Sequence, residues 1–138
     1  MKKTQKKDLS LLTELGKGKT KPSRKLEVFP SKTSNKYLVE LYTDEFTCLC
    51  PATGQPDFAK IKISYVPNKK VVESKSLKLY LWSFRNEGCF HEHLTNVILQ
   101  DFVDSAEPIW CMVEGDFNVR GGIGIKVTAQ SGKRPENL

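Results

Sequence analysis

Hydrophobic and polar residues alternate along several segments of this chain, which is the pattern of strands that bury one face. The clearest segment is 58–65, where every second residue is apolar. The residues on its apolar face are Ala59, Ile61, Ile63 and Tyr65. Shorter β-rich segments lie at 25–29, 37–43, 71–72, 109–113, 116–120 and 123–127. Each of these segments is predicted to be a strand, and residues from 130 onward are predicted to be a polar tail.

The apolar period changes from two to about 3.6 residues in two segments, which predicts two helices. The first covers residues 76–84, with Ser74 as its N-cap and Gly88 as its C-terminal stop. Its apolar face consists of Leu77, Tyr80, Leu81 and Phe84. The second helix is expected at about 91–104.

The order of these elements is strands, two helices and then strands. This order is typical of an α+β fold in which the helices pack on one face of a mainly antiparallel sheet. With 138 residues, the chain is long enough for a single domain with one modest core. A sheet this small leaves edges and one face that need cover, so a homo-oligomer is expected.

The net charge of +6 is concentrated at the N-terminus. Residues 1–25 contain nine Lys or Arg and two acidic residues, whereas the rest of the chain has thirteen basic and fourteen acidic residues. We therefore expect a basic, flexible arm at 1–24 and one neutral domain at 25–138. A Lys-rich arm attracts nucleic acid, so an RNA-binding module is an alternative function, although the neutral body argues against it.

The apolar runs stop far short of the roughly 18 residues that would span a bilayer, and no hydrophobic segment follows the basic start. We therefore expect no membrane association and a cytoplasmic location. In that compartment cysteines are free thiols, metal ligands or nucleophiles rather than disulfides. The four cysteines are Cys48, Cys50, Cys89 and Cys111.

One loop brings a thiol and a carboxyl close together in the sequence, at Cys50 and Asp57. Pro51 and Pro56 lack a backbone donor and Gly54 permits a sharp reversal, so this segment is not regular structure. A thiol with a lowered pKa is a nucleophile, and a carboxyl that keeps its proton can donate it. On the residues alone, a plain turn with one small buried cysteine and one solvated aspartate is the favoured interpretation.

Other side chains leave further sites open. A zinc site would need soft ligands, although the spacing of Cys48 and Cys50 is not the C-x-x-C of structural zinc sites. The candidate ligands are Cys48, Cys50, Cys89, His91 and His93. Glu92 is either a first-turn acid of the second helix or an acceptor for the paired donors of a guanine-like edge.

A nucleotide cofactor would need a side-chain cradle, because the chain has neither a G-x-G-x-x-G nor a Walker motif. Three basic residues share one face of the first predicted helix and are candidates for phosphate contacts, or form a solvated basic stripe. They are Lys75, Lys78 and Arg85.

Four stretches of the chain carry specific combinations of residues. They are Glu73-Ser-Lys-Ser-Leu-Lys-Leu-Tyr-Leu-Trp-Ser-Phe-Arg85, Phe46-Thr-Cys-Leu-Cys-Pro-Ala-Thr-Gly-Gln-Pro-Asp57, Phe90-His-Glu92 and Arg120-Gly-Gly-Ile123. These stretches resemble the signatures of the QueF family, the NADPH-dependent 7-cyano-7-deazaguanine reductases. The similarity runs from about residue 19 to 127, and the length resembles that of the single-domain, type I branch.

The resemblance implies a tunnelling fold (T-fold), as in the GTP cyclohydrolase I superfamily, that assembles into an oligomeric barrel. A decamer of two pentamers with active sites at subunit interfaces is implied. The implied reaction is the reduction by NADPH of the nitrile of 7-cyano-7-deazaguanine to 7-aminomethyl-7-deazaguanine, in queuosine biosynthesis, without direct contact with nucleic acid. A zinc-dependent cyclohydrolase-like enzyme on the same fold is the alternative.

The resemblance also implies roles for residues. Cys50 is the nucleophile that forms a covalent thioimide, Asp57 is the proton donor, and no metal takes part. The residues implied at the deazapurine are Val72, Glu73, Ser74, His91 and Glu92. The candidates for the cofactor phosphates are Lys75, Lys78 and Arg85. Asp57 must keep its proton near neutral pH, which we expect to require desolvation by the bound base and by Phe58.

Overall fold

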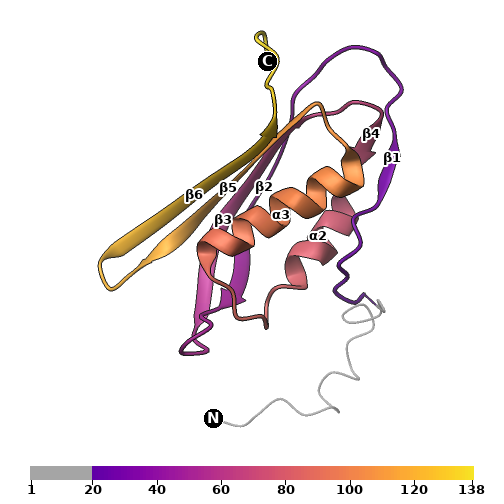
Figure 1. Cartoon of the computed structure of the whole chain (residues 1–138). Coiled ribbons are helices and arrows are strands. Elements are labelled where there is room, and N and C mark those ends of the chain that lie inside the picture. The colour runs from indigo at the N-terminus through magenta and orange to yellow at the C-terminus, as the bar shows by residue number, and fades with distance from the viewer. Residues whose placement is uncertain (1–19) are drawn as a thin grey trace.

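The computed structural model describes residues 20–138, and these form an α+β fold (Figure 1). Residues 1–19, most of the predicted basic arm, lie outside the described part. The strands are β1 (Val28–Pro30), β2 (Val39–Leu49), β3 (Pro56–Val66), β4 (Lys70–Val72), β5 (Trp110–Arg120) and β6 (Ile123–Gly132). The helices are α2 (Ser74–Trp82) and α3 (His91–Ala106). The predicted fold class is confirmed.

The main sheet is antiparallel, with the strand order β2-β3-β5-β6, and α2 and α3 lie on one of its faces (Figure 1). Strands β1 and β4 form a separate antiparallel pair. In the main sheet, Ile63 of β3 lies opposite Leu41 of β2 and Val113 of β5. These rows of apolar side chains face the helices.

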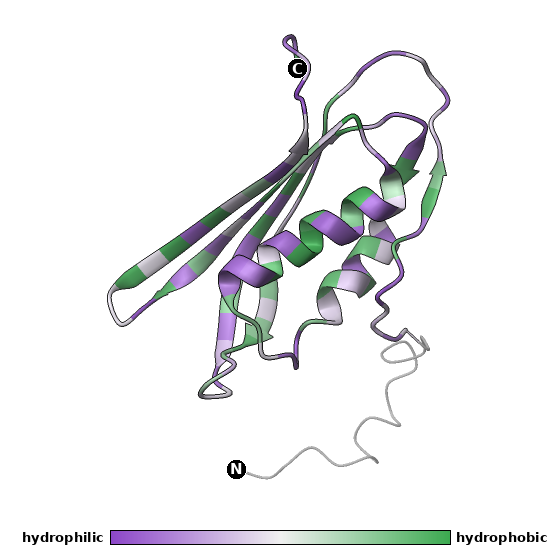
Figure 2. Cartoon of the chain, viewed as in Figure 1, coloured by the Kyte–Doolittle hydropathy of each residue, from purple (hydrophilic) through white to green (hydrophobic). Residues whose placement is uncertain are grey.

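The predicted alternation along β3 is confirmed, because Ala59, Ile61, Ile63 and Tyr65 are all buried. The strands in Figure 2 alternate between hydrophobic and hydrophilic residues accordingly. The opposite face of the sheet is charged: Lys62 pairs with Glu40 at 2.8 Å, and Lys126 pairs with Glu114 at 3.2 Å. These charged side chains suit contact with water, and whether another subunit covers this face stays a prediction. In the main sheet, β2 and β6 each keep one edge without a partner strand among the described residues.

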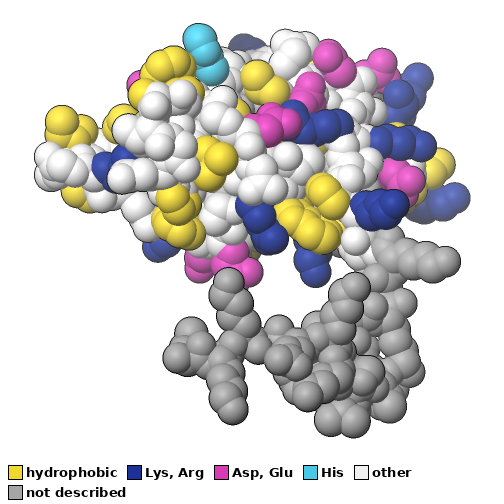
Figure 3. All heavy atoms as spheres, turned by 90° about the horizontal axis from the view of Figure 1, so that it is seen from below, with side chains coloured by type: hydrophobic (Ala, Val, Ile, Leu, Met, Phe, Trp, Pro, Cys, Tyr) yellow, Lys and Arg dark blue, Asp and Glu magenta, His cyan; other side chains and the backbone are white. Residues whose placement is uncertain are grey.

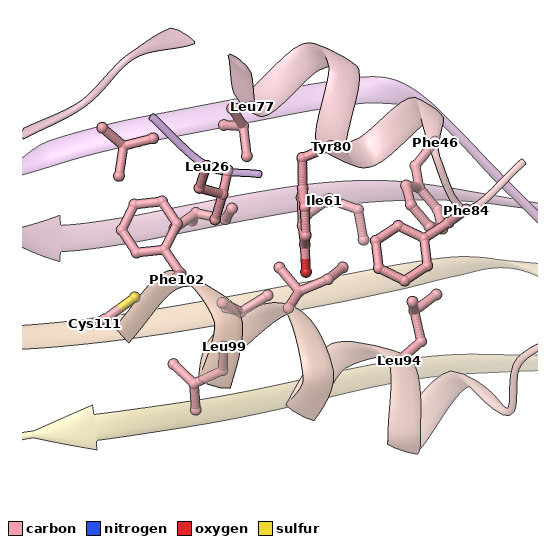
Figure 4. Packing of buried hydrophobic residues seen from close by; sticks show 14 of the residues in the cluster. Leu26, Phe46, Ile61, Leu77, Tyr80, Phe84, Leu94, Leu99, Phe102 and Cys111 are labelled. Atoms are coloured by element: carbon pink, nitrogen blue, oxygen red, sulfur yellow. The ribbon is translucent and has the colours of Figure 1, made fainter. Parts of the chain in front are cut away.

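The core fills the space between this sheet and the two helices (Figure 4). Helix α2 contributes Leu77 and Tyr80, and α3 contributes Phe102, which meets Tyr65 edge to face with ring centroids 4.8 Å apart. Leu26, ahead of β1, is buried in the same cluster. Among residues 20–138, neither helix is long and apolar enough to cross a bilayer.

Several predicted element boundaries need correction. The segments 109–113 and 116–120 form the single strand β5, and β6 continues to Gly132 into the predicted tail. The N-cap of α2 is Glu73 rather than Ser74, because the longer carboxylate accepts hydrogen bonds from two backbone N–H groups of the first turn. Helix α2 ends at Trp82, before Gly88, which instead forms an isolated bridge with Leu49.

Candidate active site

The loop between β2 and β3 is held in shape by its own backbone. The N–H of Cys50 donates to the carbonyl of Gln55 at 2.8 Å, and the N–H of Gly54 donates back to Cys50 at 2.9 Å. The start of the loop is also paired with the connection between α2 and α3, since Leu49 bonds to Glu87 and Cys89 through backbone groups. The loop therefore has a defined shape before any ligand binds.

Cys50 is the activated thiol of this loop. Hydrogen bonds from the side chain of Thr53 and from the backbone N–H groups of Thr53 and Ala52 lower the pKa of Cys50 to about 7, and Arg120 adds a smaller effect. Burial has the opposite effect on the other thiols. It raises the pKa of Cys48 to about 12, raises that of Cys111 to about 12, and raises that of Cys89. Among the described cysteines, only Cys50 is poised as a nucleophile near neutral pH.

Asp57 lies at the start of β3 and is only 4% exposed. Arg120 donates from Nη1 to its Oδ1 at 2.6 Å, and the Nε2 of His91 lies 3.2 Å from its Oδ2. Arg120 also donates from Nη2 to Gln55 at 3.0 Å. The pKa of Arg120 is raised by its bonds to Asp57 and then to Cys50. The guanidinium thus joins the thiol and the carboxyl in one site.

Phe58 does not desolvate Asp57, contrary to the prediction. Successive residues of a strand point to opposite faces, so Phe58 points away from Asp57 and is 49% exposed. The groups that cover the carboxyl come from α3 and β5 instead. His91, the first residue of α3, stacks flat on Phe117 of β5, and Arg120 is the last residue of β5.

The implied substrate residues fall into two groups. His91 and Glu92 begin α3 beside Asp57, and the carboxylate of Glu92 is exposed. The other group, 72–74, lies at the start of α2, whose far end leads to the Cys50 loop through Glu87 and Leu49. An α-helix of nine residues is about 13 Å long, so 72–74 lie roughly a helix length from that end.

Two candidates for the cofactor phosphates, Lys75 and Lys78, lie on α2, whereas Arg85 lies just beyond the end of this helix. Lys78 and Arg85 line a groove of about 430 Å³ between α2 and β2, together with the half-buried indole of Trp82. Lys75 is exposed on the same helix but does not line the groove. A register shift in β2 between Thr43 and Phe46 lies on the opposite wall. Cationic side chains around an apolar indole fit a phosphate-bearing nucleotide.

Figure 3 looks from below onto the end of the molecule that carries the β2–β3 loop. Basic, acidic and hydrophobic side chains are mixed on this face, with a histidine at its rim. For the zinc alternative, residues 20–138 contain no group of three or more His, Cys, Asp or Glu side chains arranged to hold a metal ion. The zinc-ligand set proposed from the sequence is therefore not assembled within these residues.

Sequence reasoning gave no role to two residues that the structure places in this site, Thr53 and Arg120. Thr53 lies inside the loop that was singled out, and its hydroxyl is the largest influence on the thiol. Arg120 was part of a family-like stretch, but it is 63 residues from Asp57 in the sequence. Only the pairing of β3 with β5 brings them together.

Comparisons with known proteins agree with this geometry. A family model described as QueF-like protein matches residues 56–136. Two similar proteins are named NADPH-dependent 7-cyano-7-deazaguanine reductase. The protein of Syntrophus aciditrophicus is 59% identical, and the match covers 94% of this chain and 92% of the relative. The protein of Nitrosomonas eutropha is 49% identical, and the match covers 83% of this chain and 84% of the relative. The crystal structure of the archaeosine synthase QueF-Like in the apo form matches with a TM-score of 0.65 and 26% identity, covering 71% of this chain and 96% of that chain. The fold is thus the tunnelling fold, and the chain belongs to the QueF family of NADPH-dependent 7-cyano-7-deazaguanine reductases.

Proposed function

We propose that this chain reduces the nitrile of 7-cyano-7-deazaguanine to a primary amine through a covalent thioimide on Cys50. The observation that carries the proposal is the site itself: a thiol with a pKa of about 7 and a buried carboxyl are joined by one arginine. The family membership supplies the substrate. We place the enzyme in the queuosine pathway and in the cytoplasm, where the thiol stays reduced.

The first step is addition of the Cys50 thiolate to the nitrile carbon. A nitrile accepts hydride poorly, whereas the C=N of a thioimide can be protonated and reduced. As the C–S bond forms, Asp57 gives a proton to the nitrile nitrogen, so the product is a neutral thioimide. Arg120 stabilises the thiolate before addition and orients the carboxyl that protonates the nitrogen.

Reduction then requires two hydrides and one further proton. NADPH supplies the hydrides. The first hydride adds to the thioimide carbon and the second proton to its nitrogen, which gives a tetrahedral carbon that carries an amino group and the Cys50 sulfur. Cleavage of the C–S bond then returns the Cys50 thiolate and leaves an iminium. The second hydride gives the amine. Asp57 has already given up its proton and is buried, so the second proton passes from His91, which is 15% exposed and hydrogen-bonded to it.

Glu92 and Glu73 are the acceptors that we assign to the guanine-like edge. Glu92 makes no side-chain hydrogen bond to another described residue and is free to accept paired donors. The two oxygens of Glu73 each accept one backbone N–H at 2.7 Å, from Lys75 and Ser76. A carboxylate has about four acceptor positions, so Glu73 can cap the helix and still bind the substrate. Val72 and Ser74 flank it and complete this wall.

The separation of 72–74 from Cys50 within one chain supports sites shared between subunits. We propose a homo-oligomer, a decamer of two pentamers, in which the start of α2 of one subunit completes the Cys50 site of its neighbour. Mixing Cys50→Ala with Glu73→Gln protomers, each inactive alone, tests this arrangement. Random reassembly should restore about a quarter of the sites, whereas sites built within one chain would remain inactive.

For the cofactor, we assign phosphate contacts to Lys78 and Arg85 in the groove of α2, and to Lys75 at its rim. The three cations offer charge-assisted bonds to phosphate, and the guanidinium of Arg85 lies 5.3 Å from the centre of the Trp82 ring, which holds it at the groove. No metal and no contact with nucleic acid takes part in this mechanism.

One assay tests the proposed function directly. 7-Cyano-7-deazaguanine is added to the parent or to Cys50→Ala, and the oxidation of NADPH is followed by the loss of its nicotinamide absorbance. We expect NADPH to be consumed in a ratio of about 2:1 to the nitrile, and an adduct of the nitrile on Cys50 in the mass spectrum when NADPH is omitted. Turnover or adduct formation by Cys50→Ala would contradict the proposal.

A further inference from the structure

The imidazole ring of His91 stacks on a side chain, Phe117, that is not one of the reacting groups. Its ring lies flat on the ring of Phe117, with centroids 3.8 Å apart and an angle of 8° between the planes. Phe117 is 3% exposed and points from β5 toward the helices. A flat stack fixes the plane of the imidazole, and this plane directs Nε2 to the Oδ2 of Asp57.

The backbone of His91 is held from the same place. The hydroxyl of Thr95, which is fully buried, donates to the carbonyl of His91 at 2.9 Å. Gly115 leaves the room for both supports, because a Cβ there would lie 2.8 Å from the Thr95 Oγ1 and 2.8 Å from the Phe117 Cε2. Such distances are shorter than van der Waals contact, so any side chain at Gly115 would displace one of the two supports.

From this arrangement we infer that Phe117 is a positioning residue for His91. Gly115, which has no side chain, leaves the space that the Phe117 ring occupies. The inference rests on the proposed function, in which His91 supplies the second proton, and it deepens that role. Phe117 packs in the core, and its effect on the reaction passes through His91. A residue that merely filled the core would be replaceable by any apolar side chain of similar size, whereas a positioning residue must present a flat ring.

The stack has a signature that does not depend on activity. Protons of an imidazole that lies over the face of an aromatic ring are shielded, so the His91 ring signals should lie upfield in a spectrum of histidine-labelled protein. The chain has only two histidines, and His93→Gln assigns the signals. Phe117→Leu should move the His91 signals downfield. Unshielded His91 signals in the parent would overturn the inference even if no variant folded.

Kinetics separate positioning from packing. Phe117→Leu keeps an apolar side chain but loses the flat ring, so we expect kcat to fall on the order of 10²-fold, the usual cost of misplacing a catalytic group by about 1 Å. Formation of the Cys50 adduct without NADPH needs only the first proton and should stay close to the parent rate. The matched control is Phe102→Leu, which shortens a buried ring at the other end of α3 and should leave both rates unchanged.

The outcomes distinguish a failure of the positioning role of Phe117 from a failure of the proposed function. A loss of kcat in Phe117→Leu with adduct formation retained supports the inference. Equal losses of both rates, or no loss of either, would overturn it. If the parent itself does not oxidise NADPH with the nitrile, the proposed function fails, and the shielding of His91 still reports whether Phe117 holds the ring.

Discussion

Replacing Thr53 by valine removes the largest single influence on the Cys50 thiol while keeping the shape of the side chain. The pKa of Cys50 is lowered to about 7, first by the hydroxyl of Thr53, then by the backbone N–H groups of Thr53 and Ala52, and least by Arg120. Valine deletes only the hydroxyl. The backbone donors remain, because they belong to the hydrogen-bonded loop.

The expected magnitude follows from the thiolate fraction. With a pKa of about 7, about half of Cys50 is thiolate at pH 7, whereas an ordinary thiol with a pKa near 8.5 is only a few per cent thiolate. Thr53→Val should raise the pKa by part of that difference and lower the reactivity at pH 7 several-fold, by at most about tenfold. Since the parent pKa is lowered, the thiolate is lost as the pH falls through about 7, and the variant should lose it at a higher pH.

The assay is alkylation of Cys50 by iodoacetamide between about pH 5 and 10, followed on the Cys50 peptide by mass spectrometry. Cys48 and Cys111, with pKa values raised to about 12, are internal references that should stay unmodified. Thr53→Ser keeps a hydroxyl and is the matched control. Identical midpoints for Thr53→Val and the parent would refute the reasoning. So would a rate that is slower by the same factor at high pH, where both thiols are ionised.

Further predictions address the rest of the molecule. Arg120→Gln leaves a buried carboxyl without its cation and should slow adduct formation, with Arg120→Lys intermediate, as measured by mass spectrometry. Tyr80→Phe removes a partly buried 2.6 Å hydrogen bond to the carboxylate of Asp101 and should lower the free energy of unfolding by about 1.5 kcal/mol, measured by urea denaturation. Lys78→Ala combined with Arg85→Ala should raise KM for NADPH with little change in kcat, by steady-state kinetics. Removing residues 1–19 should leave kcat/KM unchanged, whereas a loss of activity would give the basic arm a role.

The fold was predictable where local pattern and tertiary environment agree. The alternation along β3 and the helical period of α2 each describe a face that meets the core, so both were predicted correctly. Strand β5 was predicted as the two pieces 109–113 and 116–120, and Gly115 lies in the gap between them. The reason for that glycine lies elsewhere in the chain: it makes room for the side chains of Thr95 and Phe117.

The site was predictable only in part, for the same reason. Cys50 and Asp57 share one loop, so a local motif was enough to propose both. Arg120 is brought to Asp57 by the register of β5 against β3 and by the two-residue turn at Gly121-Gly122, where both φ angles are positive as in a type I′ hairpin. No local pattern in the sequence encodes a contact across 63 positions.

This contact changes how the proton chemistry has to work. The proposed mechanism needs a thiolate that attacks and, next to it, an acid that gives up a proton. Arg120 places one positive charge beside both groups and so stabilises the attacking Cys50 thiolate. Phe58, together with the bound base, was expected to desolvate Asp57 so that it keeps its proton, and Phe58 points the other way. In the proposed mechanism the second proton therefore comes from His91, whose Nε2 lies 3.2 Å from the Oδ2 of Asp57, because an imidazole can exchange protons with solvent. We therefore expect the position of that imidazole, and hence its stacking on Phe117, to affect the second half of the reaction rather than the first.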